Sequence, residues 1–576
     1  MKKSTLLLGC VAAVALVTGC TDSAYDLSDI DSTTEIKINN LAIPINMEAI
    51  TLDQIIDVKE GESLKVVNGK YAVSVDGSFS SDPIKIKNIH IASPSIAPTI
   101  TTLNQAGAQS SMLKAPSVNF AVPEVTTSFS YYDDEVDPAV VDITSAKVSD
   151  MVLAIKLSLP ELTSVIDEVI INHLTFDLPK GLSGTPSMGS YDSSKGLLTI
   201  NNVKTSPAGL NISLPISEID LDAAGAIFDS ETHTFDFQGE IKITDGEIGV
   251  DPTRLSNPTS VPTTIDLRVD YNMSALDVNS ICGRLQYDVP DFVIPDVDLT
   301  NLPDFLRQKG TNIILNNPQI YLSLDNPLYA THLSASTGLT LTAIRDGRPT
   351  NVCSLSEPVK VGSDKGVGPY NFCLSPYKPD FLAGFENAEY VNFKTLGHIV
   401  EGDGLPEAIH IIADDPSFPA QDVTDLKIGY DYGSISGKYN FYAPLALDAG
   451  STITYSDSDT GWASDDLDDL TIENIRITAN VTTDVNAEVI ASGSPLDKQE
   501  LPMANVNVSS VTVPANAKDY PIEINVTGDI KGIDGFLYTV RIAAPDGENA
   551  DALGPDQQIK LTNIRAYATG KYVTKP

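Results

Sequence analysis

The sequence predicts an all-β protein made of several tandem β-sandwich-like modules, and three observations support this. Thr, Val, Ile, Asp, Asn and Ser are plentiful, whereas long amphipathic helical runs are almost absent. Hydrophobic residues make up 42% of the chain, which is enough for ordinary globular cores. A chain of 576 residues is also too long for one core, so the usual domain size predicts roughly three or four modules.

An eight-residue pattern recurs in the predicted strands, with apolar residues at positions 1, 3, 6 and 8 and Asn at position 5. It begins at positions 36, 84, 470 and 559, as in "LTIENIRI". Because strand side chains alternate between faces, positions 1 and 3 would face away from positions 6 and 8. One extra residue at the Asn, in a β-bulge, returns all four to one face. The pattern therefore predicts bulged strands that wrap sandwich cores.

Looser versions of this pattern extend the set. "LTINNVKT" at 198 and "IILNNPQI" at 313 keep the Asn, whereas "VDITSAKV" at 141 and "VNVSSVTV" at 506 replace it with Ser. Their irregular spacing argues against a solenoid of fixed period.

Turn and helix signals are also present. Residues 65–79 predict a hairpin, with Asn68-Gly69 suited to a type I′ turn. Short helices are predicted at 51–58 and 302–310.

Module boundaries are expected where the composition changes. Residues 288–305 are punctuated by proline and predict an extended connector, and an acidic loop at 456–469 precedes the last module. The expected segments are a β-module at 35–130, a β-module at 131–270, a connector at 271–310, a β-module at 311–455 and a C-terminal β-module at 456–576.

The charge of the chain limits its partners. Asp and Glu number 77 against 37 Lys and Arg, which gives a net charge of −40. Such a surface repels nucleic-acid phosphates and anionic lipid headgroups, so no nucleic-acid partner is expected. The acidity indicates either solubility outside the cytoplasm or binding of cations or cationic partners.

The first twenty residues have the parts of an export signal. Lys2 and Lys3 form a positive start, residues 5–17 form an apolar stretch too short to span a bilayer, and Cys20 follows small residues. The sequence Val17-Thr18-Gly19-Cys20 resembles the lipobox of bacterial lipoprotein signal peptides. That resemblance implies removal of residues 1–19 and acylation of Cys20, and two or three acyl chains would anchor the protein firmly.

Residues 20–34 hold the acylated Cys and a polar, acidic linker of the kind that stays disordered. With this linker the chain resembles Bacteroidetes cell-envelope lipoproteins, which implies an outer-membrane location through the lipid anchor. Whether the periplasmic or the surface face carries the protein stays open. No later stretch has 18 uninterrupted apolar residues, so the body after Cys20 is expected to be water-soluble.

Three cysteines remain after Cys10 leaves with the signal and Cys20 is acylated. Three thiols allow at most one disulfide in a monomer. Cys353 and Cys373 bracket a Gly- and Ser-rich loop and are the expected pair, whereas Cys282 is expected to be a small buried apolar group.

Catalytic motifs are not found in the sequence. There is no G-x-S-x-G elbow, HExxH pair, P-loop, dinucleotide fingerprint or zinc spacing, and the six histidines are scattered. We therefore expect no catalytic residues and no enzymatic activity.

The acidic loop offers a candidate calcium site, and calcium is the single cofactor considered. Asp457, Asp459, Asp465 and Asp466 surround Gly461, and closely spaced carboxylates on a Gly-containing loop can bind Ca²⁺. The spacing departs from that of an EF-hand, and the alternative is a solvated acidic loop.

The same loop contains Trp462, the single Trp of the chain. An exposed aromatic ring beside carboxylates can stack on a sugar ring. The alternative is a Trp that plugs the loop against the edge of its module.

Three functions are compatible with these features. The first is a non-enzymatic, lipid-anchored cell-envelope protein with a binding, adhesive or structural role toward an unknown protein or glycan ligand. The second is a lipid-handling protein with an apolar β-groove. The third is a glycan-binding or glycan-degrading outer-membrane lipoprotein.

Overall fold

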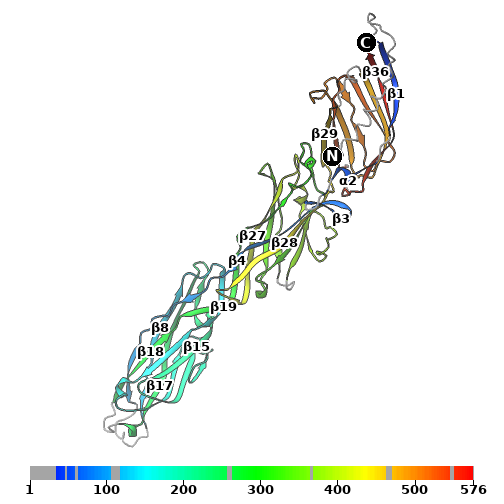
Figure 1. Ribbon diagram of the computed structural model, residues 1–576. Helices are drawn as coiled ribbons and strands as arrows, with labels where there is room; N and C mark the ends of the chain where they lie inside the picture. Colours follow the sequence, from blue (N-terminus) through cyan, green and yellow to red (C-terminus); the bar gives the residue numbers. More distant parts are fainter. Residues whose placement is uncertain are drawn as a thin grey trace.

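The computed structural model describes residues 34–45, 49–56, 58, 62–105, 117–255, 263–362, 368–461, 470–544 and 551–574. The chain is almost entirely β, so the predicted fold class is confirmed. Three lobes follow one another in an elongated molecule (Figure 1). Within the described residues, no helix reaches the length and hydropathy needed to cross a bilayer.

The lobe at one end contains both the first and the last strand, and we call it the terminal lobe. It is a sandwich of two sheets. The six-stranded sheet consists of β1 (Thr34–Ile45), β36 (Gln558–Thr574), β30 (Leu470–Thr483), β34 (Tyr520–Ile530), β32 (Val506–Val508) and β2 (Ile50–Thr51). The four-stranded sheet consists of β29 (Thr452–Thr460), β35 (Gly535–Ala543), β31 (Glu488–Leu496) and β33 (Val511–Val513).

The middle lobe is a second sandwich. Its six-stranded sheet consists of β26 (Glu389–Asn392), β25 (Tyr370–Ser375), β21 (Gln319–Asp325), β28 (Asp431–Pro444), β4 (Lys70–Lys85) and β3 (Leu64–Val67). Its other strands are β20 (Phe292–Asp298), β22 (Ala335–Arg345), β23 (Arg348–Ser354), β24 (Val359–Val361) and β27 (Ala408–Lys427). These belong to a twenty-stranded sheet that continues into the next lobe.

The distal lobe, at the end opposite the termini, holds the remaining strands of that sheet (Figure 1). They are β5 (His90–Ile91), β6 (Thr99–Gln105), β7 (Val118–Ala121), β8 (Val125–Asp133), β9 (Val140–Ser149), β10 (Val152–Ser158), β11 (Val169–Asp177), β12 (Leu182–Gly184), β13 (Ser190–Asp192), β14 (Leu197–Thr205), β15 (Leu210–Asp220), β16 (Ile227–Asp229), β17 (Thr234–Val250), β18 (Thr264–Met273) and β19 (Leu276–Asp288). The two lobes are joined by β27, whose first half pairs with β22 and whose second half pairs with β19.

The strand order is nested. The chain starts in the terminal lobe with β1, passes through the middle lobe in β3 and β4, and builds the distal lobe from β5 to β19. It then returns through the middle lobe and completes the terminal lobe with β29 to β36. The first strand pairs antiparallel with the last, and Thr34 lies opposite Thr574.

The boundaries predicted from sequence do not follow these lobes. The segment 271–310 is not a connector, because β19 and β20 within it are paired strands of the large sheet. The segment 35–130 is divided among all three lobes, and the segment 456–576 lacks β1 and the start of β29. Proline-rich and acidic stretches of the sequence mark turns. The lobe to which a strand belongs depends instead on which distant strands it pairs with.

Helices are few and short within the described residues. The α-helices there are α2 (Leu52–Ile55) and α3 (Leu221–Ala224), and the 3₁₀ turns are Pro160–Leu162, Pro252–Arg254, Asp304–Arg307, Tyr329–Thr331 and Lys394–His398. The predicted helical segments 51–58 and 302–310 therefore each contain one short turn of helix. The predicted hairpin is confirmed, since Asn68 (φ 52°) and Gly69 (φ 74°) join β3 to β4.

The recurring eight-residue pattern marks β-bulges in several strands. In β30 the register shifts between Ile472 and Asn474, and Ile472 and Ile475 are both buried. The extra residue there is Glu473 rather than the predicted Asn474. In β36 the extra residue is Asn563, which has the positive φ of 54° that Asn tolerates.

Two further copies also contain a shift. In β1 the register changes between Ile38 and Leu41, and in β9 Thr144 has no opposite residue on β19.

The copy at 198 lies within β14, whose pairing with β11 shows no register shift, although Asn202 has a positive φ of 53°. The other copies also differ from the prediction. The copy at 84 is a break between β4 and β5, and the copy at 313 lies mostly outside strands. In the copy at 506 the chain leaves β32 in one sheet of the terminal lobe and enters β33 in the other. The pattern therefore marks places where a regular strand is interrupted. A bulge is the commonest kind of interruption among these copies.

The lobes differ in how their cores are filled. One continuous hydrophobic cluster runs through the distal and middle lobes and reaches the inner end of the terminal lobe. The distal core includes three aromatic rings in mutual contact, from Phe129, Tyr131 and Phe237, with centroids 5.2–6.3 Å apart. The rest of the terminal lobe has separate, smaller clusters of Ile, Val and Ala.

Candidate functional site: an apolar cavity in the terminal lobe

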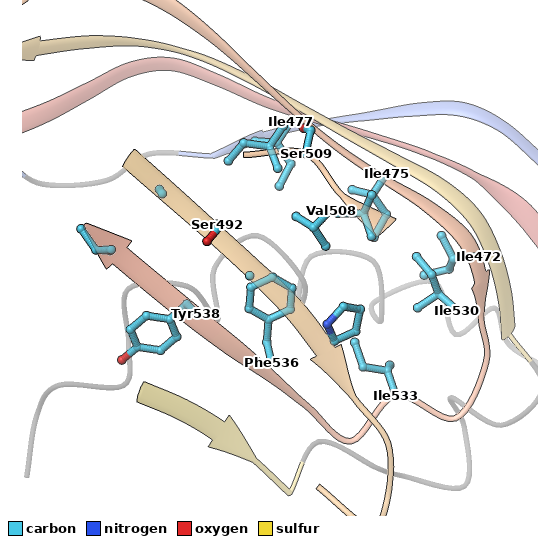
Figure 2. A pocket seen from close by; sticks show the side chains of 16 residues that line it. Ile472, Ile475, Ile477, Ser492, Val508, Ser509, Ile530, Ile533, Phe536 and Tyr538 are labelled. Carbon is cyan, nitrogen blue, oxygen red and sulfur yellow. The ribbon is translucent and has the colours of Figure 1, made fainter. Parts of the chain in front are cut away.

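An apolar cavity of about 140 Å³ lies between the two sheets of the terminal lobe (Figure 2). It occupies the outer half of the sandwich, near the ends of β31 and β35 that lie farthest from the middle lobe. Its lining is almost wholly carbon, supplied by β30, β31, β32, β34 and β35 and by Ile533 next to β35. This cavity is the strongest candidate for a binding site among the described residues.

Large β-branched side chains form the wall on the six-stranded sheet. The lining from this sheet comprises Ile472, Ile475 and Ile477 of β30, Ile524, Val526 and Ile530 of β34, and Val508 of β32. Relative to β36, the bulge at Glu473 places Ile472 and Ile475 on one face, so the bulged strand is what presents a continuous apolar surface. One of the separate clusters consists of residues on and next to this sheet, with no core partner from the sheet opposite.

Small side chains on the facing strand explain why the space is empty. The inward positions of β31 are Val489, Ala491, Gly493 and Pro495, which lie opposite Ile542, Val540, Tyr538 and Phe536 of β35. Ala, Gly and Pro in succession leave the isoleucines of the other sheet without facing atoms. A void of this kind forfeits dispersion contacts on one side.

Phe536 lies across Gly493 on the neighbouring strand. A Cβ added at Gly493 would come within 2.4 Å of the Phe536 ring, so no other residue fits there without moving the ring. The ring is only partly buried and borders the cavity (Figure 2). Gly493 therefore sets the position of one cavity wall.

Tyr538, which lines the cavity, belongs to a polar group that lies outside the lining itself. The hydroxyls of Tyr538 and Tyr455 both donate to Oδ2 of Asp457 at 3.0 Å, and the Ser458 amide donates to Oδ1 at 2.8 Å. Asp457 pairs with Tyr538 across β29 and β35, so its exposed carboxylate lies on the inner face beside the lining. Burial, followed by the bond to Asp457, raises the pKa of both tyrosines above the ordinary value.

The structure places one of the four candidate calcium ligands in full. Asp457 is a strand residue bonded to two tyrosines. The side chain of Asp459, together with Asp465, Asp466 and Trp462, lies outside the described residues. Calcium binding and sugar stacking by this loop stay predictions. In the part of the chain that is described, no three His, Cys, Asp or Glu side chains gather as metal ligands.

The predicted disulfide is not formed. Cys282, Cys353 and Cys373 are free thiols, with Cys353 on β23 and Cys373 on β25 of a different sheet. The Cys353 Sγ donates to the Thr395 carbonyl at 3.1 Å, and burial raises the pKa of both thiols. Between them the chain forms β24, which pairs with β22, before it enters β25 of the other sheet, so proximity along the chain was a poor guide to the pairing.

Sequence reasoning missed the cavity. The signal that could have revealed it is "VIASGSPL" at 489–496, where every second residue is small across three inward positions. That alternation shows a strand whose inward face carries only small side chains. It does not show that this face lies opposite isoleucines of another sheet.

Comparisons with known proteins do not assign a family. No family model and no curated protein matches the chain. Among solved structures, it resembles a protein from Parabacteroides distasonis, provisionally described as secreted, at 15% identity over 50% of this chain and 89% of the other, with a TM-score of 0.36. A Broad Bean Stain Virus structure matches at 9% identity over 51% and 88%, with a TM-score of 0.11. Neither likeness carries a functional argument.

Proposed function

We propose that the protein is a lipid-anchored, non-enzymatic component of the bacterial cell envelope that holds its distal lobe away from the membrane for binding or attachment. The observation that carries this proposal is the nested strand order. It puts the first and last strands in one end lobe and the middle of the sequence at the opposite end (Figure 1).

The position of Thr34 supports the direction of this arrangement. Thr34 pairs with Thr574 at the outer end of the terminal lobe, while the other end of β36 lies beside β2 and the middle lobe. Residues 21–33 separate Cys20 from this point and span at most about 45 Å when extended. An acyl anchor on Cys20 would therefore hold the terminal lobe at the membrane, with the distal lobe farthest from it.

The chemistry of the described residues supports a non-enzymatic role. Four histidines each pair singly with a carboxylate on separate parts of the fold: His90 with Asp277, His173 with Asp245, His398 with Glu401 and His410 with Asp296. Such isolated pairs are ordinary on a protein with many carboxylates. A long apolar groove of the lipid-handling kind finds less support, since the inner faces of the distal and middle lobes are filled.

The anchor is tested by intact-mass analysis of the mature protein from envelope fractions. We expect a first residue at Cys20 carrying two or three acyl chains, and a Cys20→Ala variant that leaves the envelope fraction. A mature chain without acyl groups would contradict the anchor.

The orientation is tested by energy transfer to acceptor-labelled headgroups in vesicles that carry the lipidated protein. In a Cys282→Ser background, one donor is placed at Lys498→Cys, in the outer turn of the terminal lobe, and another at Ala208→Cys, in a distal turn. We expect strong transfer from position 498 and little from position 208. Equal transfer from both sites would mean that the protein lies flat on the membrane.

A further inference from the structure

The size and lining of the terminal-lobe cavity match those of cavities that bind small apolar groups. A cavity of about 150 Å³ lined by aliphatic and aromatic side chains stays dry and accepts a benzene-sized molecule. The cavity here has about 140 Å³, and its lining contains seven Ile and Val side chains from the six-stranded sheet. It therefore has room for about six carbon atoms.

The shape of the lining favours a chain. On β30 the lining continues from Ile472 to Ile477, and on β31 from Ala491 to Pro495, so both walls extend along the strand direction (Figure 2). An alkyl chain lying parallel to the strands would contact both walls along its length.

Charge beside the cavity indicates the head group of the occupant. The exposed Asp457 carboxylate accepts a hydrogen bond from Tyr538, which lines the cavity. The strand that carries Asp457, β29, contains no Lys or Arg. Arg476 and Arg541 on the lining strands alternate with inward residues and lie on the outer faces. The exposed Lys531 lies in the connection between the lining residues Ile530 and Ile533.

We propose that this cavity binds the end of the alkyl chain of a single-chain amphiphile whose head group is cationic. The tail fills the space left by Ala491, Gly493 and Pro495, and the head stays in solvent beside Asp457. This inference does not depend on the anchor proposed above, because it concerns the folded body of the protein alone.

Binding is expected to depend on tail length in a defined way. Each methylene transferred from water into the cavity should tighten binding by about fourfold. The gain should stop at about six carbons, when the cavity is full. An ammonium head should bind at least about fivefold more tightly than a sulfate head on the same tail, and this preference should weaken with salt.

The experiment is calorimetric titration of the full chain with n-alkylammonium salts from butyl to decyl, alongside n-alkyl sulfates of the same lengths. Ala491→Phe should abolish binding of both series by filling the cavity. Ile490→Phe, which puts the same ring on the outer face of β31, is the matched control and should leave binding unchanged.

Two further variants keep the test decisive if Ala491→Phe folds poorly. Ala491→Val should shorten the tail length at which affinity stops rising by about two carbons. Asp457→Asn should remove the preference for ammonium while keeping the length dependence. Affinity that is indifferent to tail length, or unchanged in Ala491→Val, would overturn the tail site. Equal binding of both heads by the unmodified protein would overturn the role of Asp457.

Discussion

The distal and terminal lobes are both β-sandwiches with bulged strands, but their interiors are filled differently. The distal lobe packs Phe129, Tyr131 and Phe237 together, each at most 5% exposed. The terminal lobe has no fully buried aromatic ring among its described residues, and its Phe536 is only partly buried beside a cavity. The difference shows that one strand pattern can produce either a packed core or an unfilled space, depending on the size of the facing residues.

Two glycines illustrate the comparison. A Cβ at Gly239 in the distal lobe would come within 2.4 Å of Phe129, and a Cβ at Gly493 would come equally close to Phe536. Each glycine thus lets a ring from the neighbouring strand lie across it. In the distal lobe that ring lies within the continuous hydrophobic cluster, whereas in the terminal lobe the ring borders the cavity.

Removing one ring from each lobe should have the largest effect. Phe237→Ala is expected to cost about 3–5 kcal/mol of unfolding free energy, because a fully buried ring leaves a large cavity. Phe536→Ala should cost only about 1 kcal/mol, since its ring is partly exposed and already borders a void. Native-state hydrogen exchange of each lobe measures the two values separately. Similar costs at both sites would mean that the terminal lobe is as tightly packed as the distal lobe.

Adding a methyl group at the two glycines should have the next largest effect. Gly239→Ala is expected to destabilise the distal lobe by about 1–3 kcal/mol, because Phe129 and Pro179 must both move. Gly493→Ala should cost less, because Phe536 can turn toward the cavity. Hydrogen exchange again measures the loss of unfolding free energy. A greater loss for Gly493→Ala than for Gly239→Ala would contradict the idea that the Phe536 ring can move into the cavity.

Enlarging an alanine should change stability in opposite directions in the two lobes. Ala146→Val in β9, where Ala146 is 2% exposed in the packed core, should destabilise by about 1 kcal/mol. Ala491→Val should stabilise the terminal lobe by about 1 kcal/mol, because it fills empty space and favours the strand. Denaturant unfolding, followed separately for each lobe, measures whether each substitution raises or lowers the free energy of unfolding. Destabilisation by Ala491→Val would show that the terminal-lobe cavity is closed in solution.

The smallest effect concerns alkaline pH. Burial, with a smaller contribution from Asp192, raises the pKa of Tyr191 in the distal lobe to about 12. The unfolded tyrosine loses its proton near pH 10 while the folded one keeps it, so this contribution is complete below pH 10 and is lost as pH rises toward 12. Tyr191→Phe should reduce the loss of stability over that range.

Little else should change in that variant, because the Tyr191 hydroxyl has no hydrogen-bond partner among the described residues. The contrast is Tyr538→Phe in the terminal lobe, which also removes the hydrogen bond to Asp457 and should weaken the lobe at neutral pH. Unfolding curves at pH 8 and pH 11 distinguish the two. If the Tyr191→Phe protein lost stability between pH 8 and pH 11 as the unmodified protein does, the raised pKa of Tyr191 would not be the cause of that loss.

Much of the local structure could be predicted from sequence. The hairpin at Asn68-Gly69 and the bulges in β30 and β36 follow from turn chemistry and from a two-residue period that shifts by one, although in β30 the extra residue is Glu473 and not the predicted Asn474. The site was only partly foreseen. Asp457 was singled out for calcium, but its two tyrosine partners and the cavity beside it come from distant strands.

By itself, the sequence determined the fold class, the strands and where they bend, because these depend on side-chain alternation and on backbone preferences within a few residues. Only the tertiary structure decided that β1 pairs with β36, that Cys353 and Cys373 lie on different sheets, and that small residues of β31 face the isoleucines of β30 and β34. The pairing of distant strands depends on the free energy of burying whole sheet faces against each other. A local stretch of sequence does not contain the information that decides this pairing.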